Sequence, residues 1–211
     1  MTVELIEWPS MGAELAGEAA AVCTDGKHPE KSLLHSMESG HESVLEHLSY
    51  TFCIQGVSRV LLAQLTRHRI ASFSVQSQRY VRMKNAEVIE PESIQGSEEA
   101  GKLFEEIAGR AKEAYNRLLD LGIPAEDARY LLPQGVATKL YMTMNARELR
   151  HFFALRCCTR AQWEIRELAT IMLHKCQAVT PEVFRDAGPE CLRTGCREGR
   201  RSCGKPWKKP D

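Results

Sequence analysis

The order of strand-like and helical segments is the feature that most limits the fold of this chain. Strand-like patterns are confined to four short stretches, at 3–8, 48–55, near 87–91 and at 136–144. The longest helical pattern covers 97–122, where Ser97 can cap the first turn and Gly122 can end the helix. A regular alternation of strand and helix is missing, which excludes a doubly wound parallel sheet. The pattern predicts an α+β fold with several long helices and few, antiparallel strands.

Helical patterns account for most of the remaining chain. Further helices are predicted at 29–40, 43–48, 57–66, 124–133, 145–158, 159–176 and 180–184. Ser43 with Glu46 has the spacing of a capping box, and Asn145 with Glu148 has the same spacing. Thr159 with Gln162 repeats it, which predicts a break between two consecutive helices.

Charge and composition restrict the possible partners. Lys and Arg together number 28, as do Asp and Glu, so the net charge over 211 residues is zero. A general nucleic-acid-binding surface is therefore not expected, because such surfaces carry excess positive charge. The N-terminus lacks a signal-peptide pattern, and no stretch approaches the roughly 20 apolar residues of a membrane span. We expect a cytoplasmic protein without membrane contacts, in which the eight cysteines are reduced.

Common cofactor and metal motifs are absent from the sequence. Neither a dinucleotide-binding glycine pattern nor a P-loop occurs. His41 and His47 in "HESVLEH" are six residues apart rather than the four of a zinc protease helix, so no zinc site is expected there. The late cysteines Cys176, Cys191, Cys196 and Cys203 do not have standard zinc-knuckle spacing. Free thiols are the favoured interpretation of these four, and a structural metal is the alternative.

The stretch 67–80, "RHRIASFSVQSQRY", is the strongest candidate for a binding site. A charged surface loop and a nucleic-acid patch are two interpretations of it. A pocket for phosphate and cofactor is the third, because arginine side chains bind phosphate oxygens in a bidentate manner and serines complete such a cradle. Ser, Gln and Ala between the arginines favour a pocket wall.

Other arginines bear on the same question. Arg147 and Arg156 lie nine residues apart on one predicted helix and therefore on opposite faces, so this helix could serve two sites at a subunit interface. Arg150 is expected to be solvated. Arg129 lies beside apolar residues in "ARYLLP", where either a bound anion or an internal carboxylate would compensate its charge.

The chain resembles a known family, the flavin-dependent thymidylate synthases. The pattern Arg67-His68-Arg69, seven residues and Ser77 is similar to the family signature. "GHESVLEH", "ARYLLP", "NARELRHFFALR" and "AQWEIRELA" resemble its other landmarks in the same order, over roughly residues 40 to 175. The resemblance implies the family's own α+β fold, that of thymidylate synthase-complementing proteins, with an antiparallel sheet and several long helices.

The resemblance also implies a reaction, the reductive methylation of dUMP to dTMP. Methylenetetrahydrofolate would supply the carbon, and NADPH would supply electrons through FAD. The expected partners are these small molecules and further copies of the chain, in a homotetramer with interfacial active sites; neither nucleic acid nor a membrane is expected. A non-catalytic, arginine-rich nucleotide- or RNA-binding module is the alternative function.

Site residues are implied position by position. Those implied for FAD are Ser43, Arg67, His68, Arg69, Val75, Asn145, Arg147 and His151, with Asn145, Arg147 and His151 coming from a neighbouring subunit. Those implied for dUMP are Gln64, Arg67, Gln76, Ser77, Gln78, Arg79, Arg129 and Arg156. Arg156 is the implied catalytic residue, since a fixed guanidinium would favour ionisation of the uracil ring at N3.

Several positions need a separate interpretation. The family does not use a cysteine nucleophile, so Cys157 and Cys158 are interpreted as small core residues, and Ser77 as a nucleotide-binding residue. Many members have Asn-Glu where this chain has Ser74-Val75, so a contact at Val75 would use backbone groups. The predicted organisation is one catalytic α+β domain over 1–184 and a basic Cys/Gly/Pro-rich tail over 185–211, with 8 Lys and Arg against 4 Asp and Glu.

Overall fold

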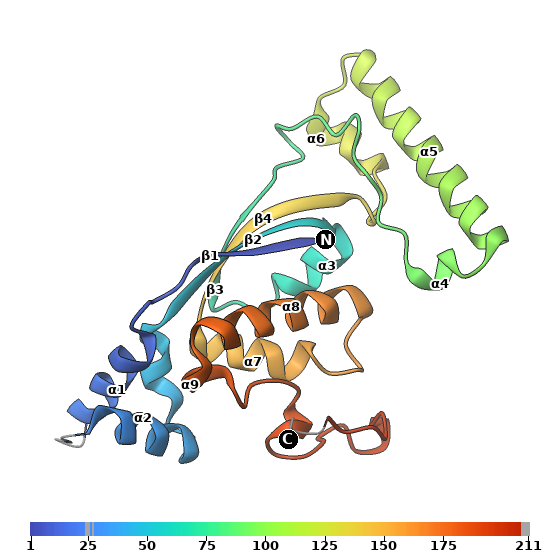
Figure 1. Ribbon diagram of the computed structural model, residues 1–211. Helices are drawn as coiled ribbons and strands as arrows, with labels where there is room; N and C mark the ends of the chain where they lie inside the picture. Colours follow the sequence, from blue (N-terminus) through green and yellow to red (C-terminus); the bar gives the residue numbers. More distant parts are fainter. Residues whose placement is uncertain (24–25, 27, 208–211) are drawn as a thin grey trace. The chain divides into compact units, whose positions relative to one another are not determined.

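The computed structural model describes residues 1–23, 26 and 28–207 (Figure 1). Contacts divide the chain into two compact units, described separately below. Unit 1 comprises Met1–Thr2, Ile54–Thr66 and Ser74–Leu140, and unit 2 comprises Val3–Cys53, Arg67–Phe73 and Tyr141–Asp211. Each unit therefore combines segments that are distant in the sequence. The predicted boundary at 184/185 stays a prediction.

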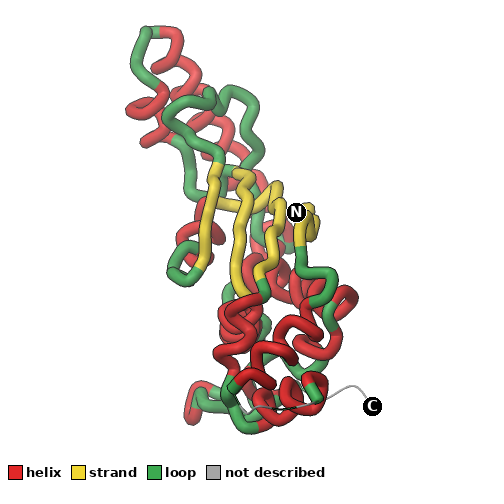
Figure 2. The backbone as a smooth tube through the Cα atoms, turned by 90° about the vertical axis from the view of Figure 1, so that its left-hand side faces the viewer, coloured by secondary structure: helices red, strands yellow, loops and turns green. Residues whose placement is uncertain are grey.

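Four strands form one antiparallel sheet, as the α+β prediction required. They are β1 (Thr2–Glu7), β2 (Ser49–Ser58), β3 (Ala71–Val75) and β4 (Ala137–Asn145), in the order β1-β2-β4-β3. Figure 2 shows the strands in yellow. Tyr50, Phe52 and Ile54, which alternate along β2, are fully buried. β3 lies inside the arginine-rich stretch and was not predicted, whereas the strand expected near 87–91 is only a single bridge between Val88 and Val136.

In the part of the chain that the structure describes, unit 2 contains six helices before residue 185. Their bounds are α1 (Gly12–Val22), α2 (Pro29–Glu38), the 3-10 helix η1 (Glu42–His47), α7 (Ala146–Arg156), α8 (Trp163–Val179) and α9 (Pro181–Phe184). α1 packs on α2, and α7 contacts both η1 and α8. Phe152, Phe153 and Phe184 are fully buried here, and Phe184 meets the ring of Tyr50 edge-on at 5.3 Å between centroids. This aromatic core packs α7 against α9.

Two of the three capping-box predictions were wrong in detail. The Asn145 side chain accepts the Glu148 N–H at 2.9 Å and begins α7, as predicted. At η1 the position before the helix is His41, without a side-chain cap. Gln162, rather than Thr159, caps α8 by accepting the Ile165 N–H at 3.2 Å.

Unit 1 contains α3 (Arg59–Leu65), α4 (Glu92–Gln95), α5 (Glu98–Asp120), α6 (Ala125–Ala128) and the 3-10 helix η2 (Arg129–Leu131). The long helix α5 begins at its predicted cap Ser97, which accepts the Ala100 N–H at 3.3 Å. It is followed by Gly122 at φ +83°, a conformation that favours glycine. Tyr115 is the fully buried anchor of α5, and its hydroxyl accepts the Met83 N–H at 2.9 Å.

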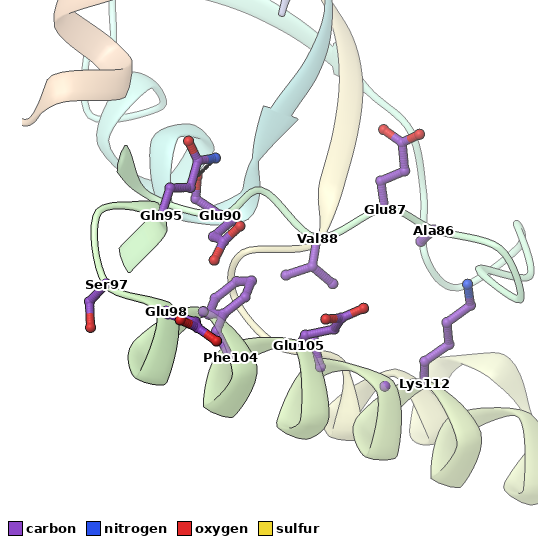
Figure 3. A pocket seen from close by; sticks show the side chains of 13 residues that line it. Ala86, Glu87, Val88, Glu90, Gln95, Ser97, Glu98, Phe104, Glu105 and Lys112 are labelled. Atoms are coloured by element: carbon purple, nitrogen blue, oxygen red, sulfur yellow. Dashed lines mark hydrogen bonds between the residues drawn. The ribbon is translucent and has the colours of Figure 1, made fainter. Parts of the chain in front are cut away.

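A groove of about 790 Å³ lies between α5 and the segment 86–98 (Figure 3). Val88 and Glu90 face it from the segment, and Phe104, Glu105 and Lys112 face it from α5. None of the site residues implied by the sequence lines this groove. Its size therefore does not identify it as the active site.

Residues 185–207, the described part of the tail, have little regular structure. They include two short 3-10 helices, η3 (Glu190–Leu192) and η4 (Gly199–Arg201). All residues from 193 to 207 are exposed. Within the described residues, no helix has both the length and the apolar character needed to cross a membrane.

Candidate active site

The first half of α7 forms one wall of a cavity of about 600 Å³ in unit 2, here called the α7 cavity. It is lined by Glu42, Glu46, Ile70, Asn145, Arg147, Glu148, Arg150, His151, Ala154, Glu190, Arg193 and Arg197. Asn145, Arg147 and His151, three of the implied FAD residues, thus face one space. Arg147 and His151 share it because they are four residues apart and so lie on one face of α7, and Asn145 lies at the start of the same helix.

Arginine–carboxylate pairs give the α7 cavity its charge distribution. Arg147 pairs with Glu46, and both side chains are about half exposed (52% and 49%). Arg197 pairs with Glu190 at 3.0 Å, again with an exposed arginine. Exposed pairs of this kind contribute little to stability and can exchange partners. An incoming anion could therefore take over the guanidinium of Arg147.

Arg150 was predicted to be solvated, and this was wrong. Its side chain is 1% exposed and donates to both carboxylate oxygens of Asp186, at 2.7 and 3.1 Å, and to the Val183 carbonyl. It also donates to Glu42 at 3.2 Å, and Arg193 reaches the same Glu42 oxygen at 3.0 Å. Sequence spacing placed Arg150 on a face with Arg147 but could not show that residues 183–186 fold back over it. Arg150 is therefore a structural tie.

The ionisation of this network follows from its geometry. Burial alone would raise the pKa of Asp186, but the hydrogen bonds and charge of Arg150 outweigh it and hold that pKa below its usual value. Burial likewise works to lower the pKa of Arg150, and Asp186 and Glu42 reverse the effect so that the pKa is raised. Both groups are consequently charged at neutral pH.

His68 connects α7 to the arginine-rich stretch. Its side chain is buried, and Nδ1 lies 3.0 Å from Glu148 Oε1. Arg156 Nε donates to His68 Nε2 at 3.1 Å. An arginine can only donate, so Nε2 is the acceptor and Nδ1 carries the proton given to Glu148. Glu148, His68 and Arg156 therefore form a hydrogen-bonded chain in which the histidine is neutral.

The pKa shifts agree with a neutral His68. Burial lowers the pKa of His68, and the charge of Arg156 lowers it further, against the opposing effect of Glu148. The pKa of Arg156 is also lowered, first by burial and then by the charge of Arg67. Two guanidiniums close to each other favour binding of an anion beside them.

The same cluster could suggest a metal site, because ligand atoms of His68, Glu148 and His151 lie within 4.8 Å of one another. Both ring nitrogens of His68 are already used, one by Glu148 and one by a cationic arginine. A metal ion here would have to displace Glu148 or lie beside the guanidinium of Arg156. The geometry therefore favours the role of an orienting chain over that of a metal centre.

A second cavity, of about 430 Å³, lies in unit 1 and is here called the Ser77 cavity. It is lined by Arg59, Leu62, Ala63, Thr66, Val75, Gln76, Ser77, Gln78 and Arg129. Four residues implied for dUMP, namely Gln76, Ser77, Gln78 and Arg129, thus share one space, and so does Val75. The turn after β3 presents its side chains there while the Gln76 N–H donates to the Lys139 carbonyl at 3.0 Å.

The Ser77 cavity has unused positive charge. Burial lowers the pKa of Arg59, and the neighbouring charge of Arg129 lowers it further. Among the described residues, no ion pair joins either arginine to a carboxylate; Arg129 Nε donates to the Glu126 carbonyl at 3.0 Å. Gln78 is 7% exposed, and its buried Nε2 has no hydrogen-bond partner among the described groups. A phosphate-like anion would satisfy both needs.

Other implied residues lie outside these two cavities. Ser43, Arg67 and Arg69 are exposed in unit 2, on η1 and on the segment before β3. Arg79 is exposed and pairs with Glu126 at 2.9 Å. Gln64, on α3, is half-buried, and its amide donates to the Val60 carbonyl at 3.5 Å.

Sequence reasoning missed two residues of the site. Glu148 was interpreted only as part of a helix cap, although its side chain holds His68. Arg59 was not singled out, because it follows a strand directly and belongs to no arginine cluster in the sequence. A burial signal could have found it, since Arg59 stands between Ser58 and a run of apolar residues.

Comparison with known proteins places this geometry in context. The family model described as thymidylate synthase complementing protein matches residues 4–182. A protein of Geobacter sulfurreducens named flavin-dependent thymidylate synthase is 53% identical over 171 residues, covering 80% of this chain and 74% of the relative. Relatives of the same name from Nitratidesulfovibrio vulgaris and Clostridium tetani are 49% and 39% identical, covering 80% and 96% of this chain and 73% and 93% of their own lengths.

Proposed function

The chain belongs to the thymidylate synthase complementing protein family, the flavin-dependent thymidylate synthases, and on this premise we propose the following reaction for it. The enzyme converts dUMP to dTMP by reductive methylation. Methylenetetrahydrofolate is the carbon donor, FAD is the flavin and NADPH is the reductant. The sequence resemblance over 40–175 and the family match over 4–182 support this proposal.

The observation that carries the substrate assignment is the Ser77 cavity. Arg59 and Arg129 converge there without a carboxylate partner among the described residues, beside the hydroxyl of Ser77 and the unsatisfied amide of Gln78. A nucleotide phosphate fits this donor set, because guanidinium, hydroxyl and amide groups all donate to its oxygens. We assign the phosphate of dUMP to this cavity.

The α7 cavity would hold flavin adenine dinucleotide on a different basis, because Arg147 is paired with the exposed Glu46 and would exchange that partner for the flavin's pyrophosphate. Arg147 and the first turn of α7 offer positive charge to a pyrophosphate, and Asn145 and His151 offer hydrogen bonds. When bound, the flavin would carry reducing equivalents from the nicotinamide donor to the pyrimidine. The role of the chain's own residues there is to bind the flavin and to orient it.

Arg156 is the residue to which we assign activation of the uracil ring. A guanidinium that donates at the ring stabilises negative charge at N3 and so favours the ionised form. His68 accepts from Arg156 Nε and thereby fixes the plane of the guanidinium, and Glu148 fixes His68 in turn. Two further nitrogens of Arg156 stay available for the substrate.

Cys157 is unsuited to act as a nucleophile towards the pyrimidine. Burial raises the pKa of its thiol to about 12, so the reactive thiolate is scarce at neutral pH. Its exposed fraction is 0%, as the sequence interpretation expected for a core residue. These observations support a mechanism without a cysteine adduct.

We further propose a homotetramer in which one active site takes residues from more than one copy. The family resemblance supports this assembly, in which Asn145, Arg147 and His151 of one copy would contact the flavin of a neighbouring copy. Size-exclusion chromatography with light scattering measures the assembly, and a monomer with full activity would contradict it.

The activity itself has a direct test. We expect the purified protein to take up FAD stoichiometrically, to oxidise NADPH in a dUMP-dependent way, and to form dTMP once methylenetetrahydrofolate is added. The variant Arg156→Ala should lose dTMP formation far more than FAD uptake. Failure to bind FAD would remove the proposal.

A second experiment separates the phosphate site from the rest of the site. Arg59→Ala should weaken dUMP binding about 10- to 100-fold, because charged hydrogen bonds contribute about 1.5–3 kcal/mol. Binding of deoxyuridine, which lacks the phosphate, should not change. Arg110→Ala on α5, whose partner Glu106 is exposed, is the control. Equal losses for dUMP and deoxyuridine would show that Arg59 does not contact the phosphate.

A further inference from the structure

Four cysteines line a third cavity, of about 640 Å³ in unit 2, here called the cysteine cavity. Cys158 comes from the turn after α7, Cys191 from η3, and Cys196 and Cys203 from the tail. The remaining cysteines lie elsewhere: Cys53, Cys157 and Cys176 are buried in the core, and Cys23 is exposed at the end of α1. The four thiols of the cavity are therefore brought together from three separate segments.

The structure changes which four cysteines belong together. The sequence grouped Cys176 with the tail cysteines, but Cys176 is fully buried in α8 and does not line the cavity. Cys158 takes its place. Cys158 was interpreted as a core residue, yet it is half-buried and lines the cavity, unlike its neighbour Cys157.

The backbone of the tail already directs donors at two of these sulfurs. The Lys205 N–H donates to Cys203 Sγ, and the Trp207 N–H donates to Cys191 Sγ, both at 3.4 Å. Gly204 has φ +69°, which lets the chain turn back on Cys203. Backbone N–H groups directed at sulfur stabilise a thiolate, the form in which cysteine binds metals.

Positive charge around the cavity favours the same state. Arg160, Arg197, Arg201 and Lys205 line it together with Arg156, against Glu190 and Glu198. Glu190 is paired with Arg197 at 3.0 Å. A zinc ion bound by four thiolates carries a net charge of about −2, which these cations would offset.

Apolar packing does not hold residues 193–207 of the tail against the rest of unit 2. All residues from 193 to 207 are exposed, and their regular structure consists of the three-residue helix η4. Gly195 and Gly199 have positive φ values of 88° and 52°, so the chain reverses repeatedly in this segment. Short segments without a core of their own are commonly held by a disulfide or a metal.

We propose that Cys158, Cys191, Cys196 and Cys203 bind one zinc-class divalent ion, which joins the tail to the end of α7. In a tetrahedral thiolate site the sulfurs lie roughly 3.8 Å apart. Among the described residues, no three of these sulfurs lie within 4.8 Å of one another. Binding therefore closes the exposed segment around the ion, so metal binding and ordering of the tail are coupled.

Metal content tests the proposal independently of catalysis. The full-length protein, purified with reduced thiols and without chelator, should contain about one zinc ion per chain. Cys158→Ser and Cys203→Ser should each lower that content at least fivefold. Cys23→Ser, an exposed cysteine outside the cavity, is the matched control and should keep it. Equal zinc content in the control and in both cavity variants would overturn the proposal.

Cobalt substitution gives a second readout. Addition of Co²⁺ to the metal-free protein should produce the thiolate charge-transfer band and the strong visible bands of a tetrahedral sulfur site, and Cys158→Ser should lose them. The metal should also slow proteolysis within 193–207. Bound iron with sulfide, a disulfide between these cysteines in the freshly purified protein, or a cobalt spectrum without thiolate bands would each contradict a zinc site.

Discussion

Three residues, Glu148, His68 and Arg156, are linked by hydrogen bonds, and we expect each to have a distinct function that follows from its burial and its partners. Arg156 alone could point its guanidinium in several directions. Because His68 Nε2 accepts from it, and because Glu148 keeps the proton on Nδ1, one orientation is selected. We therefore expect Glu148 to be a positioning residue that acts through His68.

Glu148→Gln should lower kcat roughly 10- to 100-fold, as loss of an orienting partner commonly does, while the dissociation constant of dUMP changes little. Since Glu148 raises the pKa of His68, its removal should lower that pKa further. Protonation of His68 would end its role as acceptor for Arg156, so the acidic limb of the kcat profile should move to lower pH. Kinetics across pH measure both effects.

Two controls separate positioning from folding. Asn145 caps α7 through the Glu148 backbone N–H, so the helix start is retained in Glu148→Gln. Glu148→Asp, which keeps the charge, should recover part of the lost rate. A variant with lower kcat but an unchanged pH profile would argue that Glu148 does not act through His68.

At the scale of elements, α7 presents two arginines with different consequences for stability. Arg150→Ala should lower the free energy of unfolding by about 3 kcal/mol, because Asp186 and Glu42 lose the one buried cation between them. Arg193 stays near both carboxylates and limits the loss. Arg147→Ala removes an exposed pair and should cost less than about 1 kcal/mol. Urea denaturation of the two variants measures the difference, and equal losses would contradict the assignment of Arg150 as the structural tie.

The helix α5 offers a matched pair of glycines. At Gly109, in the interior of the helix, an added Cβ meets nothing within 4 Å, so Gly109→Ala should raise the free energy of unfolding by about 0.5–1 kcal/mol. Gly122 follows the helix at φ +83°, and Gly122→Ala should lower it by about 1 kcal/mol. Thermal or urea unfolding gives both values. The same sign for both substitutions would mean that backbone conformation does not decide them.

At the scale of the whole molecule, buried ionisable groups should make the protein less stable in acid. The pKa of His68 is lowered from its usual value near 6.5, so the unfolded chain binds a proton more readily there than the folded chain. The stability from neutral His68 is complete above about pH 6.5 and is lost as the pH falls through its lower folded value. Asp186, also with a lowered pKa, adds a loss that begins near pH 4.

The melting temperature, measured between about pH 7.5 and pH 5, tests this expectation. It should fall as the pH decreases through the range in which histidines usually titrate. His68→Asn should flatten this dependence, since Asn does not titrate. His28→Asn, at an exposed histidine, should leave it unchanged. A wild-type curve that is flat over this range would contradict the argument from burial.

The sequence by itself determined those helices, strands and helix caps that depend on the local spacing of apolar and capping residues. The long helix from Ser97 to Gly122, the alternating strand β2 and the Asn145 cap depend on neighbours within a few residues, and they were found as predicted. The family resemblance singled out Gln76, Ser77 and Gln78, and these three line one cavity, while their role in binding dUMP stays a prediction. These features are local, or are encoded in a run of consecutive residues.

Only the tertiary structure decided which distant residues meet. Arg150 is buried because residues 183–186 return over α7, and Glu148 faces His68 across eighty residues of sequence. Cys158 rather than Cys176 joins the tail cysteines for the same reason. Burial and pairing arise from contacts between segments, and the spacing along one helix or strand does not contain them. The sequence shows the chemical type of each side chain, but it does not show which distant residue that side chain contacts.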